Sequence, residues 1–137
     1  MRTAYHQQLS ALSAQLAEMC GLAATAMERA THALLEADLS LAEQVIADRE
    51  HIAQLNRRAE ESALRLLALQ QPVARDLRLI MAALKINGDL ERVGDLAFNI
   101  ARSVESLIPC RQYVEQLDLS EITDIVLKML RHTIDSF

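Results

Sequence analysis

The sequence is poor in residues that break helices and in residues that build sheets. Its 137 residues include three glycines, two prolines and no tryptophan, and aromatic residues make up 3% of the chain. No alternating run rich in β-branched residues is present, so there is nothing from which to build a sheet. Apolar residues still make up 51% of the chain. This composition predicts an all-α protein.

The chain also lacks an excess of positive charge and any long apolar run. Its net charge is −5 and its arginines are scattered, which argues against a nucleic-acid-binding protein. No stretch approaches 18 uninterrupted apolar residues, and the N-terminus has no apolar signal segment. We therefore expect no membrane span, and membrane association only through partner proteins.

The two cysteines, Cys20 and Cys110, have no spacing typical of a zinc site or a disulfide framework. A reduced, cytoplasmic setting is the expectation. No base is placed near Cys20 by local pattern, so we interpret it as a small core residue and not as a nucleophile.

Apolar residues recur at helical spacing over three long segments, 4–37, 39–70 and 72–108. Pro72 suits the first turn of the third segment, and Pro109 ends it. Short connections force consecutive helices to run in opposite directions. The sequence therefore predicts an antiparallel three-helix bundle.

A fourth helix is predicted after the loop 109–117, because Asp118 and Glu121 have the spacing of a capping box. Its apolar positions resemble those of the first helix, which suggests a second repeat that is cut off. We expect a three-helix bundle over 1–108, then a linker and the start of a second repeat over 109–137. An apolar stripe without partners favours self-association, most simply a homodimer.

Oxygen ligands gather on one face of the third helix. Glu91 and Asp95 stand four residues apart, with Asn87 and Asn99 one turn further on at either end. The apolar stripe lies on the other side of the helix, so the carboxylates are expected to face away from the core. The stripe consists of Leu90, Val93, Ala97, Ile100, Val104 and Leu107.

Gly88 and Gly94 lie three residues before and after Glu91. Each costs about 1 kcal/mol relative to alanine within a helix, so their presence is expected to leave the surface bare for a metal ion or another backbone. Spacing alone leaves two simpler alternatives open. The carboxylates can be a solvated polar face, or structural partners of basic residues on the second helix, such as Arg57.

Two motifs in this region resemble one known family. The segment Asp89-Leu90-Glu91-Arg92-Val93-Gly94-Asp95, followed by Asn99-Ile100-Ala101, is similar to the signature helix of the PhoU family, the regulators of bacterial phosphate uptake. The upstream segment Gln71-Pro72-Val73-Ala74-Arg75-Asp76-Leu77-Arg78 resembles the turn that leads into that helix. The resemblance covers about residues 5–108 and implies the duplicated PhoU-like bundle.

The resemblance implies a metal site on the bundle surface. Glu91 and Asp95 match the family's E/D-x-x-x-D motif, which can bind iron, zinc, manganese or magnesium. Asn56 and Glu60 are the candidate ligands on the second helix, although relatives often carry an acid where Asn56 stands. Ala53 replaces a frequent asparagine. Asn87, Asp89 and Asn99 are candidate additional ligands.

A rival metal site would use histidines, through Glu28 with His32 or Asp48 with His51. A ferritin-like di-metal enzyme requires Glu-x-x-His on two helices, and the sequence contains no such motif. We therefore expect the histidines at surface positions.

The function that the resemblance implies is that of a cytoplasmic adaptor without catalytic activity. Such a protein restrains phosphate uptake and the phosphate-starvation response by coupling the ATPase of a phosphate ABC transporter to a sensor histidine kinase. The sequence contains no glycine-rich phosphate loop or cofactor fingerprint. The alternatives are a metal-dependent hydrolase that uses Glu91 and Asp95, and a purely structural helical bundle.

Overall fold

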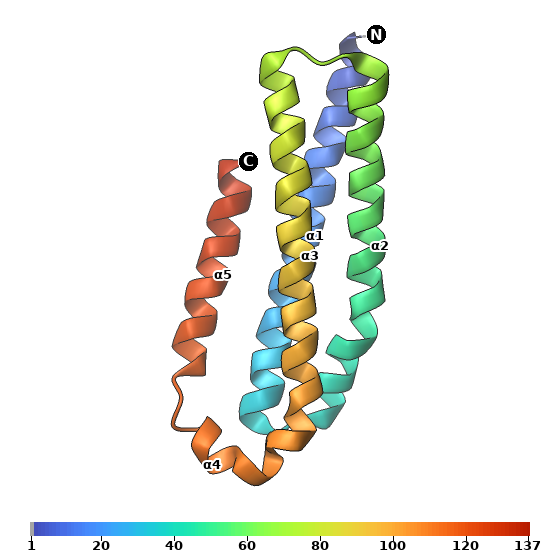
Figure 1. Cartoon of the computed structure of the whole chain (residues 1–137). Coiled ribbons are helices and arrows are strands. Elements are labelled where there is room, and N and C mark those ends of the chain that lie inside the picture. Colours follow the sequence, from blue (N-terminus) through green and yellow to red (C-terminus); the bar gives the residue numbers. More distant parts are fainter. Residues whose placement is uncertain (1) are drawn as a thin grey trace.

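A computed structural model describes residues 2–137, without the side chains of Arg2 and Gln70. Three long helices, α1 (Arg2–Glu36), α2 (Leu39–Gln70) and α3 (Ala74–Leu107), pack against one another as an antiparallel bundle (Figure 1). A 3₁₀ helix, η1 (Ile108–Cys110), and a short helix, α4 (Arg111–Val114), lead into α5 (Leu119–Ser136). The predicted helix boundaries are confirmed to within four residues, and α3 continues without a break through both of its glycines.

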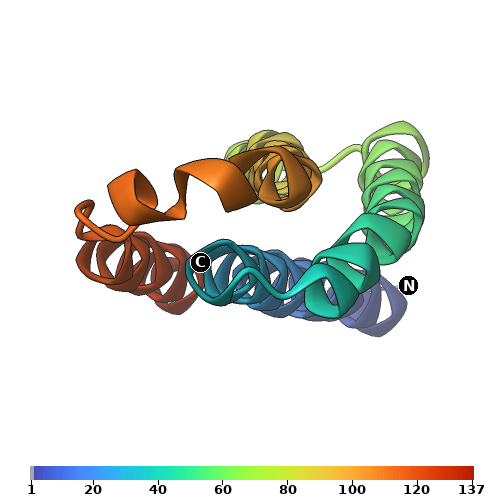
Figure 2. The ribbon, with the colours of Figure 1, turned by 90° about the horizontal axis from the view of Figure 1, so that it is seen from below.

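The fourth long helix lies against the first. α5 packs on α1, on the side of α1 away from α2, so the four helices form one bundle (Figure 2). Cys20 Sγ donates a hydrogen bond to the carbonyl oxygen of Leu130 at 3.5 Å, and the hydroxyls of Thr31 and Thr123 lie 2.9 Å apart. These bonds fix the position of α5 along α1.

Local sequence determines where the helices begin and end. Asp38 and Asp118 are the N-caps of α2 and α5, and each accepts a hydrogen bond from a backbone N–H three residues on. Ala37 ends α1 with a left-handed φ of 52°, and the N–H of Asp38 donates back to the carbonyl oxygen of Ala33. Pro72 lies just before the N-cap of α3, which is Val73, and not in its first turn.

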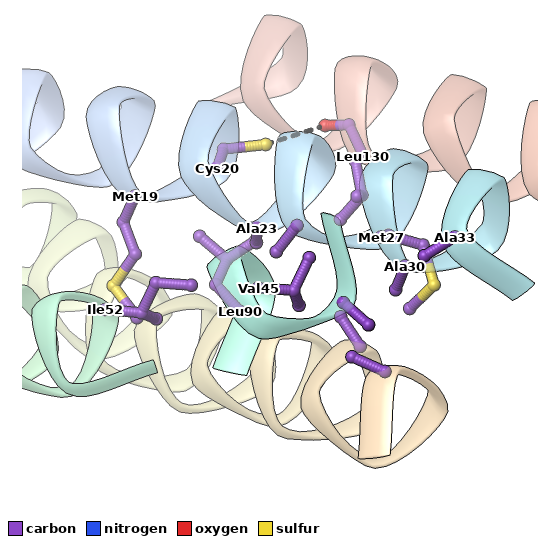
Figure 3. Close-up of a cluster of buried hydrophobic side chains, with 14 of the residues drawn as sticks. Met19, Cys20, Ala23, Met27, Ala30, Ala33, Val45, Ile52, Leu90 and Leu130 are labelled. Carbon is purple, nitrogen blue, oxygen red and sulfur yellow. Dashed lines mark hydrogen bonds between the residues drawn. The ribbon is translucent and has the colours of Figure 1, made fainter. Parts of the chain in front are cut away.

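Alanines on α1 let the helices approach closely in the core. Ala23, Ala30 and Ala33 are fully buried, and larger side chains such as Met19, Ile52 and Leu90 fill the space between helices (Figure 3). Cys20 and Leu130 extend this cluster to α5. Cys20 is thus a core residue, as expected.

The buried seam of α3 differs in part from the predicted stripe. Leu90, Ala97 and Val104 are buried as expected, whereas Val93, Ile100 and Leu107 are only partly buried. The buried positions recur at alternating spacings of three and four residues, as in a coiled-coil seam. They are Ile80, Ala83, Asn87, Leu90, Gly94, Ala97, Ala101 and Val104.

Both glycines were expected to leave open surface beside Glu91. This expectation is wrong for Gly94. Gly94 is buried on this seam, and a Cβ at this position would lie 3.2 Å from Cδ1 of Ile52 on α2. Its role is close helix packing. Gly88 is exposed and has open space around it, as predicted.

Candidate functional site

The two signature carboxylates lie on the flank of α3 that borders α2. Glu91 and Asp95 are both partly exposed and stand one helical turn apart, so their side chains share a face. Asn99, one turn beyond Asp95, is exposed as well. Asp89 is exposed but lies two residues from Glu91, on a different side of the helix.

Three contacts define the antiparallel register of α2 against α3. They join Arg49 to Asp95, Ile52 to Gly94, and Asn56 to Asn87. The stretch of α2 between Ile52 and Asn56 therefore lies opposite Glu91. This stretch includes Ala53, whose methyl side chain has no atom that could bind a metal ion.

Of the two predicted ligands on α2, Glu60 lies away from Asp95. Glu60 is exposed and lies about three turns, or 16 Å, along α2 from Arg49, which is the residue beside Asp95. Asn56 is partly buried, and its backbone carbonyl oxygen is already in contact with Asn87. The register thus separates Glu60 from Asp95.

The prediction that Asn87 belongs to the exposed row of oxygen ligands is wrong. Its side chain is 3% exposed, because its spacing from Ala83 and Leu90 places it on the buried seam. Asn87 Nδ2 donates to the carbonyl oxygen of Asn56 at 3.0 Å, and its Oδ1 is buried without a hydrogen-bond partner. Asn87 therefore links α3 to α2 inside the bundle.

A basic residue of α2 lies beside Asp95, one of the two carboxylates predicted to bind a metal ion. Arg49 Nε donates to Asp95 Oδ1 at 3.0 Å, and its guanidinium carbon lies 4.4 Å from the ring centroid of Phe98. Arg102 also approaches this ring, at 5.6 Å. Sequence reasoning missed Arg49 because the register between two separate helices brings it to Asp95. The suggested partner, Arg57, pairs instead with Glu50 on its own helix, at 2.9 Å.

Glu91 and Asp95 alone are an incomplete ligand set for a divalent cation, and Asp95 already accepts a hydrogen bond from Arg49. Magnesium is commonly bound by one or two carboxylates, with water or phosphate oxygens as its remaining ligands. Within residues 2–137, no group of three or more His, Cys, Asp or Glu side chains is placed to hold a metal ion. Any ion at Glu91 and Asp95 would therefore need ligands from outside these side chains.

The histidines lie at the surface, and Cys20 lies in the core. His6, His32, His51 and His132 are all exposed, as expected. Burial raises the pKa of the Cys20 thiol, which keeps it protonated and unreactive at neutral pH.

A groove of about 810 Å³ lies between α3 and the end of α5, and its lining includes Arg75, Arg78 and His132. Neither Glu91 nor Asp95 lines it. Tyr5 is buried, and its pKa is raised first by burial and then by the negative charge of Asp76, another groove residue. The groove is thus separate from the carboxylate face.

Comparison with known proteins decides the family. The PhoU domain matches residues 16–104, which include all of the carboxylate face and most of the three-helix bundle. The chain belongs to the PhoU family. The resemblance of the two motifs to this family is thereby confirmed.

Several PhoU proteins are similar to this chain over most of its length. The phosphate-specific transport system accessory protein PhoU homolog 2 of Mycobacterium tuberculosis is 58% identical over 118 residues, which cover 86% of this chain and 55% of that protein. PhoU homolog 1 of the same organism is 47% identical over 131 residues, covering 96% and 57%. The chain thus spans little more than half the length of these relatives.

A solved structure shares the fold. The crystal structure of PhoU from Pseudomonas aeruginosa superimposes with a TM-score of 0.86 at 36% sequence identity, covering 97% of this chain and 64% of that chain. The PhoU fold therefore includes the packing of α5 as well as the three-helix bundle.

Proposed function

We propose that this PhoU-family chain is an accessory protein of a phosphate-specific transport system and a negative regulator of phosphate uptake. The observation that carries the proposal is the 58% identity to a PhoU homologue named for that system. The chain spans 55% of that relative. The proposal therefore covers only functions that this one helical bundle can perform, and not those of the whole relative.

The proposed partners are the ATPase of a phosphate ABC transporter and a sensor histidine kinase, with the chain acting as an adaptor between them in the cytoplasm. No helix in the described part of the chain is long and apolar enough to cross a membrane. A long four-helix bundle offers separate faces to two partners, and coupling by binding requires no catalytic cycle.

Binding to the purified transporter ATPase tests this proposal. Biolayer interferometry with the immobilised chain should show saturable binding of the ATPase, and the cytoplasmic part of the kinase should bind in a second experiment. A chain of similar size and charge from an unrelated helical bundle is the control. Binding no stronger than that of the control to both partners would contradict the adaptor function.

We further propose that Glu91 and Asp95 hold a divalent or transition metal ion, with manganese, magnesium, iron and zinc as candidates and Asn99 as an additional ligand. The supporting observation is that both carboxylates are partly exposed on one face, beside the open surface at Gly88. A bound ion would supply a positive charge that can hold phosphate oxygens.

The double variant Glu91→Gln, Asp95→Asn tests this site. Calorimetric titration with Mn²⁺ should detect binding to the parent and none to the variant, while the melting temperatures stay close because partly exposed groups contribute little to the core. The variant Asp89→Asn, with a carboxylate on another side of the same helix, should bind as the parent does. Equal affinity of the parent and the double variant would exclude these carboxylates as ligands.

We propose in addition that copies of the chain associate through α5. Ile122, Ile125 and Met129 are 57%, 51% and 63% exposed and share one face of α5, whereas Leu130 is buried against α1. Exposed apolar faces of this kind are typical of interfaces.

A further inference from the structure

Three basic residues form a row along the outward face of α3. Arg78, Lys85 and Arg92 stand seven residues apart, which is about two helical turns, so their side chains leave nearly the same side of the helix about 10 Å apart. All three are exposed. They lie on the side of α3 opposite the buried seam, and Figure 1 shows α3 at the front of the bundle with no other described element over it.

The positive charge of this row is not neutralised within the described part of the chain. None of the three basic residues forms an ion pair there. Asp89 stands four residues after Lys85 and three before Arg92, but it pairs with neither. The net charge of the whole chain is −5, so this row contrasts with the overall composition. A face of this kind is complementary to an acidic surface.

Two large apolar side chains on the same face are left open to water. Met81 lies between Arg78 and Lys85 and is 54% exposed, and Leu96 lies one turn beyond Arg92 and is 49% exposed. In helix-mediated recognition, apolar side chains supply the buried contact, and charged residues beside them fix the position of the partner. The outward face of α3 has both of these parts.

Gly88 lies in the middle of the row, and the packing of this chain does not explain it. It is exposed, and a Cβ at this position would meet nothing within 4 Å. A glycine within a helix costs about 1 kcal/mol relative to alanine, so the isolated chain would be more stable without it. Glycine also lets another backbone approach closely. The open space at Gly88 therefore fits a partner that lies directly on α3.

We propose that this face of α3 is the docking surface for an acidic helix of a partner protein. The face consists of Arg78, Met81, Lys85, Gly88, Arg92 and Leu96. The partner helix carries aspartate or glutamate at the same seven-residue period, opposite the three basic residues, with apolar side chains between the acids. The inference rests on the proposed adaptor function, and it assigns the surface that one of the two partners uses.

Binding of the transporter ATPase and of the cytoplasmic part of the kinase to the whole immobilised chain tests the inference. The triple variant Arg78→Gln, Lys85→Gln, Arg92→Gln should bind one of these two proteins about tenfold more weakly than the parent does, because three charged contacts are lost. Thermal melts should stay close to that of the parent, since exposed charges contribute little to stability.

The second helix offers a matched control for this change of charge. The triple variant Arg57→Gln, Arg58→Gln, Arg65→Gln also removes three exposed basic residues, but from α2. It should change the affinity for either protein by less than about threefold. Equal losses in the α2 and α3 variants would show a general effect of charge, and would overturn the docking surface.

The variant Gly88→Leu tests the close approach separately from charge. Leucine fills the space that the partner helix needs, so binding should weaken by about tenfold, whereas the melting temperature should not fall because leucine is the better helix former. Gly21→Leu is the matched control, since Gly21 is also exposed within a helix and a Cβ there would meet nothing within 4 Å. This control should bind as the parent does.

The outcomes separate the inference from the proposed function. Binding of the parent to a partner that is unchanged in the α3 triple variant and in Gly88→Leu would overturn the docking surface and leave the adaptor function standing. No binding of the parent to either protein would overturn both.

Vesicles that contain phosphatidylglycerol distinguish a partner helix from an anionic membrane surface. The chain should not cosediment with these vesicles at physiological salt, where exposed charges are screened. Cosedimentation that is lost in the α3 triple variant, together with unchanged binding of both proteins, would assign the face to a membrane and overturn the inference.

Discussion

Asn87 is the residue at which α3 departs from a purely apolar seam. One end of its amide is bonded to the Asn56 carbonyl oxygen, and the other end, Oδ1, is buried without a partner. Buried polar groups that lack a partner reduce stability, so this side chain is retained at a cost. A polar residue at one seam position disfavours other registers between helices, which is the role we assign to Asn87.

Substitution of Asn87 tests this environment. Asn87→Asp keeps the shape but buries a negative charge, and should lower the free energy of unfolding at pH 7 by about 2 kcal/mol or more. Asn87→Leu removes the unpartnered oxygen and should be neutral or stabilising. Urea denaturation measures both, and an Asn87→Asp variant as stable as the parent would contradict the buried position.

The two cysteines differ in how far they are buried. Burial raises the pKa of Cys20, and its thiol donates to the Leu130 carbonyl oxygen, whereas Cys110 is exposed. Only a thiolate reacts with iodoacetamide. Mass spectrometry of the native chain at pH 8 should show alkylation of Cys110 long before Cys20. Equal rates in the folded protein would mean that α5 does not cover Cys20.

At the scale of the element, α2 and α3 meet through small residues as well as through polar pairs. A Cβ at Gly94 would lie 3.2 and 3.3 Å from Cδ1 and Cγ2 of Ile52, while a Cβ at Gly88 would meet nothing within 4 Å. The two glycines of the signature helix therefore have different roles, although each stands three residues from Glu91.

Alanine substitutions should separate these roles. Gly88→Ala should stabilise the chain by about 0.5–1 kcal/mol, because alanine is the better helix former and the space is open. Gly94→Ala should gain less or destabilise, because Ile52 must shift to make room. Combination of Gly94→Ala with Ile52→Val should recover part of the difference. Equal gains from the two single variants in thermal melts would argue against the close packing of α2 and α3.

The sequence predicted elements better than it predicted contacts between them. Caps, prolines and apolar spacing act within one helix, so the boundaries of α1, α2 and α3 and the cap at Asp118 could be derived from local chemistry. The sequence placed Val93 on the buried face of α3 in place of Gly94, because glycine has no side chain and is not counted as apolar in such a pattern. The pairing of Arg49 with Asp95 depends on the register between two helices, which spacing along one helix does not encode.

At the scale of the molecule, α5 packs on α1 and also carries apolar residues that stay exposed. Leu130 is buried towards α1, whereas Ile122, Ile125 and Met129 remain exposed. The expected division at residue 108 remains a prediction, as does the homodimer. The structure shows an exposed apolar face on α5, and the proposed association uses this face.

Self-association should depend on that face. The chain should sediment in part as a dimer at tens of micromolar, and Ile125→Lys should shift it to monomer by placing a charge in the contact. Leu64→Lys is a matched control, because Leu64 is also 51% exposed but lies on α2. Sedimentation of the parent as a pure monomer, or equal effects of the two variants, would contradict an interface on α5.

The proposed function predicts that this PhoU-family chain restrains the phosphate-starvation response. The most direct measurement is the activity of a phosphate-starvation promoter, fused to a reporter, in a bacterial strain that lacks its own PhoU protein and is grown with abundant phosphate. Expression of this chain should lower reporter activity relative to an empty vector, and Leu90→Asp, which disrupts the core, should not. Unchanged reporter activity in cells that accumulate the folded chain would contradict the claim.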